Sequence, residues 1–238
     1  MLSPSEIMQR RLLRWAIIFI LFWAIATWTT HLPTKDIYRS NTYWIQHMRQ
    51  YQQQIEADPK NAAIPMNFLA NAYVDQGKID LAIQTYKRSI ALNPDLPNAY
   101  NGLGNIYENR HDYVKALEYF TQSIARGPHQ YYFAYINRGY TYFLLSQLDK
   151  ALEDFNEAAK IDPRYANTYF NLGLVYQRQG NLPRALENYQ KAISLAPNDV
   201  SNAVIYEKRA EIYKIMGNDK AAQADSNMAD YLEIFHHY

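Results

Sequence analysis

From about residue 60 onward, apolar residues recur with the spacing of one face of an α-helix, in short segments that end at glycine or proline. One such face has the spacing i, i+3, i+4 and i+7 and consists of Tyr100, Leu103, Gly104 and Tyr107. A second stripe follows at Ala116, Phe120 and Ser123. This period predicts two amphipathic helices in each segment, which together form a hairpin.

The hairpin pattern repeats every 34 or 35 residues. Prolines mark the period, at Pro59, Pro94, Pro128, Pro163 and Pro197. Alanines recur in step, at Ala82, Ala116, Ala151, Ala185 and, after a slightly longer gap, Ala222. An aromatic residue lies four positions after each of the first four alanines, and a tyrosine lies nine positions before each. A unit of this kind exposes an apolar face and is stable only when it stacks on neighbouring units.

Glycines occur at two kinds of position in the repeat. Those on the apolar face of the first helix, which allow a neighbouring helix to approach closely, are Gly104, Gly139 and Gly173. Those that we expect to end the first helix are Gly77, Gly180 and Gly217. The prolines are expected to end each second helix and to start the next unit.

This pattern closely resembles the tetratricopeptide repeat (TPR) family, which implies an all-α solenoid of stacked helix hairpins. The segments LGNIYENRHDYVKALEYFTQSIARGP and NLGLVYQRQGNLPRALENYQKAISLAP carry the family's glycine, tyrosine, alanine, aromatic and proline positions in order. The resemblance covers roughly residues 61–235, within a predicted solenoid domain of 61–236. We expect five units, near residues 63–96, 97–130, 132–165, 166–199 and 203–236. The fifth lacks the aromatic residue and the closing proline, as befits a terminal cap.

The N-terminal region carries a different signal. Residues 15–28 read WAIIFILFWAIATW and contain no charge. A helix over residues 12–28 extends roughly 25 Å at 1.5 Å per residue, just enough to cross a bilayer core with some local thinning. Three arginines, Arg10, Arg11 and Arg14, precede the uncharged run, so the positive-inside rule places residues 1–14 in the cytoplasm. We therefore predict a single-pass protein of the bacterial inner membrane, with periplasmic repeats and lipid contact through residues 12–28.

Two alternatives to the transmembrane helix remain open. Ala24-Ile25-Ala26 fits the cleavage pattern of a secretory signal peptide. The apolar run could also form a buried or interfacial helix, although it has no polar face. Between this run and the repeats, we expect a linker over residues 29–39 and a capping helix over residues 40–58.

Composition and motifs argue against catalysis. The 238 residues include no cysteine and have a formal net charge of +1, without a basic stripe for nucleic acid. We find no phosphate-binding loop, nucleophile elbow or zinc-protease motif. His236-His237 is better explained as a frayed tail than as a metal site. The sequence therefore predicts a protein that is not an enzyme and that holds no metal or cofactor.

The resemblance implies that the first helix of each unit lines a concave groove, where partner peptides lie. We expect the groove-facing residues of the first two units to be Asn67, Asn71, Asp75, Asn98, Asn101, Asn105 and Asn109. Those of the third and fourth units are Phe133, Ile136, Asn137, Tyr140, Phe143, Asn167, Phe170, Asn171, Leu174 and Arg178. The fifth unit offers Glu207, Lys208, Glu211 and Lys214.

This set predicts a groove that changes from amide-rich, through aromatic and apolar, to mixed charge. Asparagine can pair with the backbone of an extended peptide, and aromatic residues can anchor its side chains. The alternative is that the asparagines are ordinary solvated helix residues and that Phe133 and Tyr140 pack against a neighbouring unit. Asn67, Phe133 and Asn137 stand where family members that bind chaperone tails need basic residues, so we do not expect that ligand.

The sequence therefore predicts a membrane-anchored scaffold that binds a partner protein through an extended or helical segment. Its role would be that of an accessory subunit or assembly factor of a membrane or periplasmic complex. Two further interpretations stay open. One is a cytosol-facing protein similar to an import receptor, which the arginine placement disfavours. The other is a recruiting or regulatory subunit of an enzyme complex, with catalysis on another chain.

Overall fold

The computed structural model describes residues 34–127, 131–197 and 199–236. The chain divides into two compact parts, residues 1–53 and 54–238, and we describe each by itself. Over the described residues, the structure consists of eleven α-helices and one short 3-10 helix, without strands. This confirms the predicted all-α class.

The first part and the start of the second part share helix α2 (Thr34–Ala57). It contains the helix predicted over residues 40–58. The predicted linker differs from the structure, because residues 34–39 belong to this helix. No proline or glycine occurs between Thr34 and Ala57, so nothing in the sequence interrupts it. Its capping role stays a prediction.

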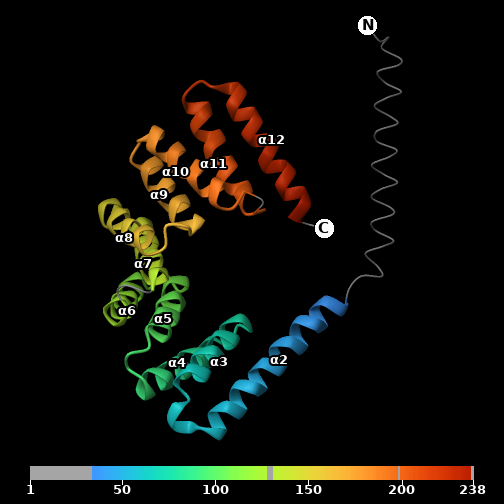
Figure 1. Cartoon of the computed structure of the whole chain (residues 1–238), viewed down its shortest axis with the longest axis vertical. Helices are drawn as coiled ribbons and strands as arrows, with labels where there is room; N and C mark the ends of the chain where they lie inside the picture. Colours follow the sequence, from blue (N-terminus) through green and yellow to red (C-terminus); the bar gives the residue numbers. More distant parts are fainter. Residues whose placement is uncertain (1–33, 128–130, 198, 237–238) are drawn as a thin grey trace. The chain divides into compact units, whose positions relative to one another are not determined.

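The second part, residues 54–238, contains a stack of five helix hairpins, introduced by the short helix η1 (Pro59–Asn61) (Figure 1). The hairpins are α3 (Ala63–Asp75) with α4 (Ile79–Leu92), α5 (Pro97–Asn109) with α6 (Tyr113–Arg126), α7 (Tyr132–Leu144) with α8 (Leu148–Ile161), α9 (Ala166–Arg178) with α10 (Leu182–Leu195), and α11 (Asn202–Ile215) with α12 (Asp219–His236). These bounds match the five predicted units. The repeat period alone was sufficient to locate them.

Inside the second, third and fourth units, a glycine of the first helix receives the aromatic ring of the second. The repeat alanines Ala82, Ala116, Ala151 and Ala185 are fully buried. A Cβ atom at Gly104 would lie 2.4 Å from the ring of Phe120, and one at Gly173 would lie 2.4 Å from the ring of Tyr189. The close approach predicted for these glycines is therefore confirmed.

Neighbouring units share their cores, as stacking requires. One cluster joins Tyr86 of α4 to Leu103 and Ile106 of α5. Another joins Phe155 of α8 to Leu172 of α9. A third cluster joins α10 to α11 in the same way. Each hairpin thus buries its apolar face against the next one.

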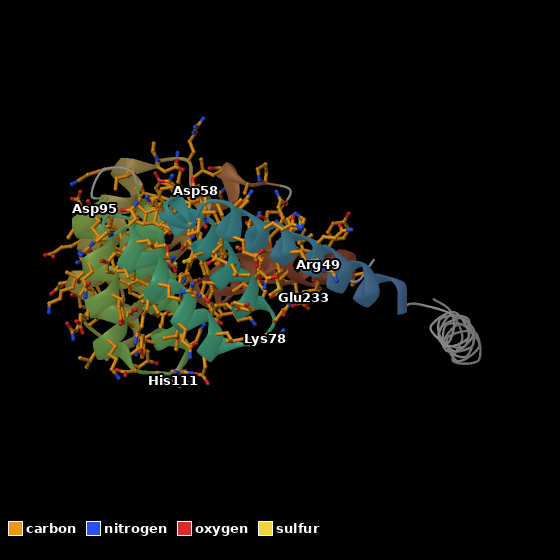
Figure 2. All side chains as sticks on the ribbon, turned by 90° about the horizontal axis from the view of Figure 1, so that it is seen from below. Arg49, Asp58, Lys78, Asp95, His111 and Glu233 are labelled. Atoms are coloured by element: carbon orange, nitrogen blue, oxygen red, sulfur yellow. The ribbon has the colours of Figure 1, made fainter. Side chains whose placement is uncertain are left out.

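The turns between the two helices of each hairpin lie along one edge of the stack. Figure 2 shows Lys78 and His111, from two such turns, on the edge opposite to Asp58 and Asp95, which belong to the connections before α3 and α5. The predicted helix-ending glycines Gly77, Gly180 and Gly217 have φ values of 70°, 76° and 72°. His111 and Ser146, both at φ 59°, take this left-handed conformation in the other two turns.

The predicted transmembrane segment, residues 12–28, lies outside the described residues. So do the cytoplasmic segment 1–14 and residues 29–33 of the predicted linker. Within the described part of the chain, none of the helices combines the length and the apolar character needed to cross a bilayer.

Candidate partner-binding groove

The first and second units enclose a polar pocket of about 430 Å³ between α3 and α5. All six asparagines predicted for these two units line it, namely Asn67, Asn71, Asn98, Asn101, Asn105 and Asn109. Asp75 lies at the same pocket, as predicted. The structure thus gathers these predicted residues in one pocket, and their role in partner binding stays a prediction.

Hydrogen bonds hold several of these amides in place. Nδ2 of Asn137 on α7 donates to Oδ1 of Asn101 at 3.0 Å and to Oδ1 of Asn105 at 2.9 Å. The hydroxyl of Tyr86 donates to Oδ1 of Asn71. Asn137 is therefore a bridge between the second and third units, and it fixes the orientation of two pocket amides.

Two tyrosines complete the pocket, and the sequence pattern did not indicate them. Tyr86 is the repeat aromatic of α4, and its ring approaches Gly102 of the next unit. Tyr131 precedes α7 and forms a hydrogen bond with Asn101. Burial raises the pKa of Tyr131 to about 12 and raises that of Tyr86 as well. Both hydroxyls therefore keep their protons near neutral pH.

The pocket also contains a buried polar atom that lacks a partner. Asn67 is only 4 % exposed, and its Oδ1 has no hydrogen-bond partner among the described residues. Leaving such a group unpaired costs about 1–3 kcal/mol. Because this oxygen has almost no accessible surface, a ligand in the pocket does not reach it, whereas the Nδ2 groups of Asn71 and Asn105 can donate to a ligand carbonyl. The pocket therefore suits a neutral peptide backbone.

The electrostatic character of this pocket agrees with that ligand class. Asp75 is its one charged residue, and no lysine, arginine or histidine of the described chain lines it. A terminal carboxylate would find no basic partner here. The expectation that this protein does not bind chaperone tails by a carboxylate clamp is consistent with this lining.

In the middle of the groove, two of the predicted residues are buried. Ile136 and Asn171 are 5 % exposed and line neither described pocket, whereas Asn67, which is similarly buried, lines the α3–α5 pocket. Ile136 lies in a core cluster because α7 turns this side toward the next unit. Phe133 and Tyr140 remain exposed, and Phe133 makes an edge-to-face contact of 5.5 Å with Tyr165, the last residue of the same unit, immediately before α9. The groove and packing interpretations of these two residues both stay predictions.

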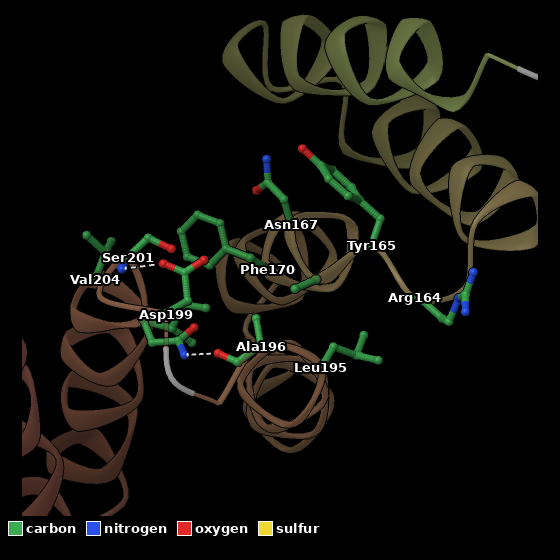
Figure 3. Close-up of a pocket in the computed structure, with 12 residues that line it drawn as sticks. Arg164, Tyr165, Asn167, Phe170, Leu195, Ala196, Asp199, Ser201 and Val204 are labelled. Atoms are coloured by element: carbon green, nitrogen blue, oxygen red, sulfur yellow. Dashed lines mark hydrogen bonds between the residues drawn. The ribbon is translucent and has the colours of Figure 1, made fainter.

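A second pocket of about 610 Å³ lies between the fourth and fifth units. Of the predicted residues, Asn167 and Phe170 line it. Figure 3 shows the ring of Phe170 directed from α9 toward the start of α11, where Ser201 and Val204 lie. The connection between these units, from Leu195 to Asn202, is longer than the other connections between hairpins.

The remaining predicted residues lie outside the two pockets. Leu174 packs on a core cluster, and Arg178 lies over the ring of Phe143 at 5.1 Å. In the fifth unit, Lys208 pairs with Glu211 at 2.8 Å, and Glu207 and Lys214 are exposed. The structure thus brings the amide residues into one site but does not join all the predicted residues into a single continuous cavity.

Stacked helix hairpins with glycine–aromatic packing define a class of repeat scaffold. Family profiles described as "TPR repeat" match residues 70–109 and 139–180, and those described as "Tetratricopeptide repeat" match residues 97–130 and 166–199. Together they cover about half of the chain. The chain therefore belongs to the tetratricopeptide repeat family, and its repeat stack is a protein–protein interaction scaffold.

Similar proteins agree with this assignment. The photosystem I assembly protein Ycf3 of Rippkaea orientalis is 29 % identical over 32 % of this chain and 53 % of its own length. The structure of MamA has a TM-score of 0.61 at 24 % identity, and covers 71 % of this chain and 96 % of that one. The structure of YrrB, a TPR protein with an unusual peptide-binding site, has a TM-score of 0.58 at 21 % identity, covering 78 % and 93 %. The chain spans between 8 % and 53 % of the length of the curated relatives that it matches.

Proposed function

We propose that this protein binds an extended segment of a partner protein and serves as an accessory subunit or assembly factor. The pocket between α3 and α5 carries the proposal, because six amides converge there and several of them are held by hydrogen bonds. These groups match the donors and acceptors of a peptide backbone, independent of its side chains. The similarity to Ycf3, an assembly protein, and to YrrB, which has a peptide-binding site, favours the same role.

The proposal includes the cellular setting predicted from the sequence. Residues 12–28 would anchor the chain in a bacterial inner membrane, with residues 1–14 in the cytoplasm and the repeats in the periplasm. The apolar run and its preceding arginines support this topology. Protease treatment of intact spheroplasts tests it. We expect external protease to cleave the repeats, whereas protection until the membrane is opened would place them in the cytosol.

Site-specific photocrosslinking tests the groove. A photoreactive residue at Asn98, which is exposed at the pocket, should give a discrete adduct with one partner in native membranes. The matched control is Asn156, an exposed asparagine on α8 that lines neither pocket. Adding Asn71→Ala and Asn109→Ala should remove the Asn98 adduct while leaving the helical circular dichroism unchanged. Equal adducts from Asn98 and Asn156, or persistence in the double variant, would contradict partner binding in the groove.

A further inference from the structure

The edge of the stack that carries the hairpin turns differs between its two ends. We define the turn edge as the eight residues around each turn, from the end of the first helix to the start of the second. The windows are residues 74–81, 108–115, 143–150, 177–184 and 214–221. None of the charged groups of the last three windows lines either pocket, although Arg178 and Lys214 were predicted to face the groove.

Charge separates the first two windows from the last three. The first two windows contain three basic and four acidic residues. Arg110 forms an ion pair with Asp80, and Lys115 forms one with Asp112. The last three windows contain five basic and only two acidic residues. These five are Lys150, Arg178, Arg184, Lys214 and Lys220. All five are exposed, and none of them forms an ion pair within the described chain.

The neutral partners of these cations leave their charges uncompensated. Lys150 donates to Gln147 at 2.9 Å and lies over the ring of Tyr142. Arg178 donates to Ser146 at 3.3 Å, and Arg184 lies over the ring of Tyr176. These contacts hold the side chains along the edge without neutralising them, so this part of the edge carries a positive field.

Exposed apolar residues occupy the tips of two of these three turns. At the two positions before the left-handed residue, the third unit has Leu144-Leu145 and the fifth has Ile215-Met216. Their exposed fractions are 38 % and 38 %, and 68 % and 53 %. The other three units have polar residues at these positions. The apolar groups therefore protrude from turns and lie outside both pockets.

From this combination we propose that the turn edge of the third to fifth units docks on the surface of an anionic lipid bilayer. Protruding apolar side chains enter the headgroup region, and the surrounding lysines and arginines pair with lipid phosphates. A protein partner with an acidic surface would match the charge. Exposed apolar side chains at separate turns favour a soft surface that deforms around each tip. The proposal does not depend on ligand binding in the α3–α5 pocket.

The absence of cysteine allows a direct test on the full chain. Met216→Cys and Leu145→Cys each carry one environment-sensitive fluorophore, and the labelled proteins are reconstituted in lipid nanodiscs, where both membrane faces are accessible. Discs of phosphatidylcholine with phosphatidylglycerol are compared with discs of phosphatidylcholine alone. We expect a blue-shifted, stronger emission at both positions only with the anionic lipid, and its loss at high salt.

The matched control is Val114→Cys in the second unit, because Val114 is 80 % exposed on the part of the same edge that has no excess of basic residues. Its probe should report water in both kinds of disc. Each of Lys214→Gln and Lys220→Gln should weaken the docking equilibrium about fivefold. Water-like emission from residues 145 and 216 in anionic discs, or equal shifts at residue 114, would overturn the proposal. The scaffold protein of the disc is the same in both lipid compositions, so a shift confined to the anionic discs reports contact with the anionic lipid.

Discussion

The second and fourth units differ from the third and fifth at one position of the first helix, immediately before the small residue of the repeat. The second and fourth have Leu103 and Leu172 there, which are buried in the core. The third and fifth have Arg138 and Arg209 at the equivalent place. Arginine at a buried position requires a partner, and both units supply an aspartate on the second helix.

The two ion pairs have the same geometry. Arg138 donates to both carboxylate oxygens of Asp154 at 2.8 and 2.7 Å, and Arg209 does the same with Asp225. Each arginine also reaches back to the preceding unit, to Thr121 of α6 at 3.2 Å or to Gln190 of α10. The comparison shows that one repeat position accepts either a leucine or a bidentate ion pair, and that the pair adds a polar link between units.

The largest effect is expected when one partner of the pair is removed. Asp154→Ala leaves the largely buried guanidinium of Arg138 without its counter-charge, so we expect a loss of about 3–5 kcal/mol in the free energy of unfolding. Urea denaturation followed by circular dichroism measures it. Glu153→Ala, at the exposed neighbouring position, should change this free energy by no more than about 0.5 kcal/mol. A loss below that of an ordinary surface substitution would mean that Arg138 escapes to solvent.

Replacing both partners should not lower the free energy of unfolding. Arg138→Leu together with Asp154→Asn gives the third unit the pair that the fourth unit has in Leu172 and Asn188. Because no buried charge remains, we expect stability to be unchanged or raised by about 1–4 kcal/mol. A double-mutant cycle with the two single variants measures the coupling. A double variant as unstable as Asp154→Ala would show that the link to Thr121 matters more than the pair.

These pairs illustrate what the sequence could and could not predict. The repeat spacing located every hairpin, because glycine, alanine and the aromatic residue have fixed packing roles in each unit. A pattern that is common to the units does not indicate Arg138 and Asp154, because these two residues depart from it. Their role depends on a contact between two helices that no single-helix period describes.

The candidate site shows the same limit. Helical spacing placed the asparagines of α3 and α5 on one side, and the structure gathers them in one pocket. Spacing did not distinguish the surface of α7 from the side that packs on α9, so it assigned Ile136 to the groove although this residue lies in a core cluster. Tyr131 lies in a connection, where no period applies, and only the three-dimensional arrangement brings it to Asn101.

The smallest expected effect concerns the turns, which again differ between units. The first, fourth and fifth turns have glycine in the left-handed conformation, whereas the third has Ser146 at φ 59°. This conformation costs a residue with a Cβ atom about 1–2 kcal/mol. Glycine also has greater freedom in the unfolded chain, which offsets part of the gain. We therefore expect Ser146→Gly to raise the free energy of unfolding by roughly 0.5–1 kcal/mol. The reciprocal change Gly180→Ser in the fourth unit should lower it by a similar amount, and equal signs for the two variants would show that backbone strain is not the cause.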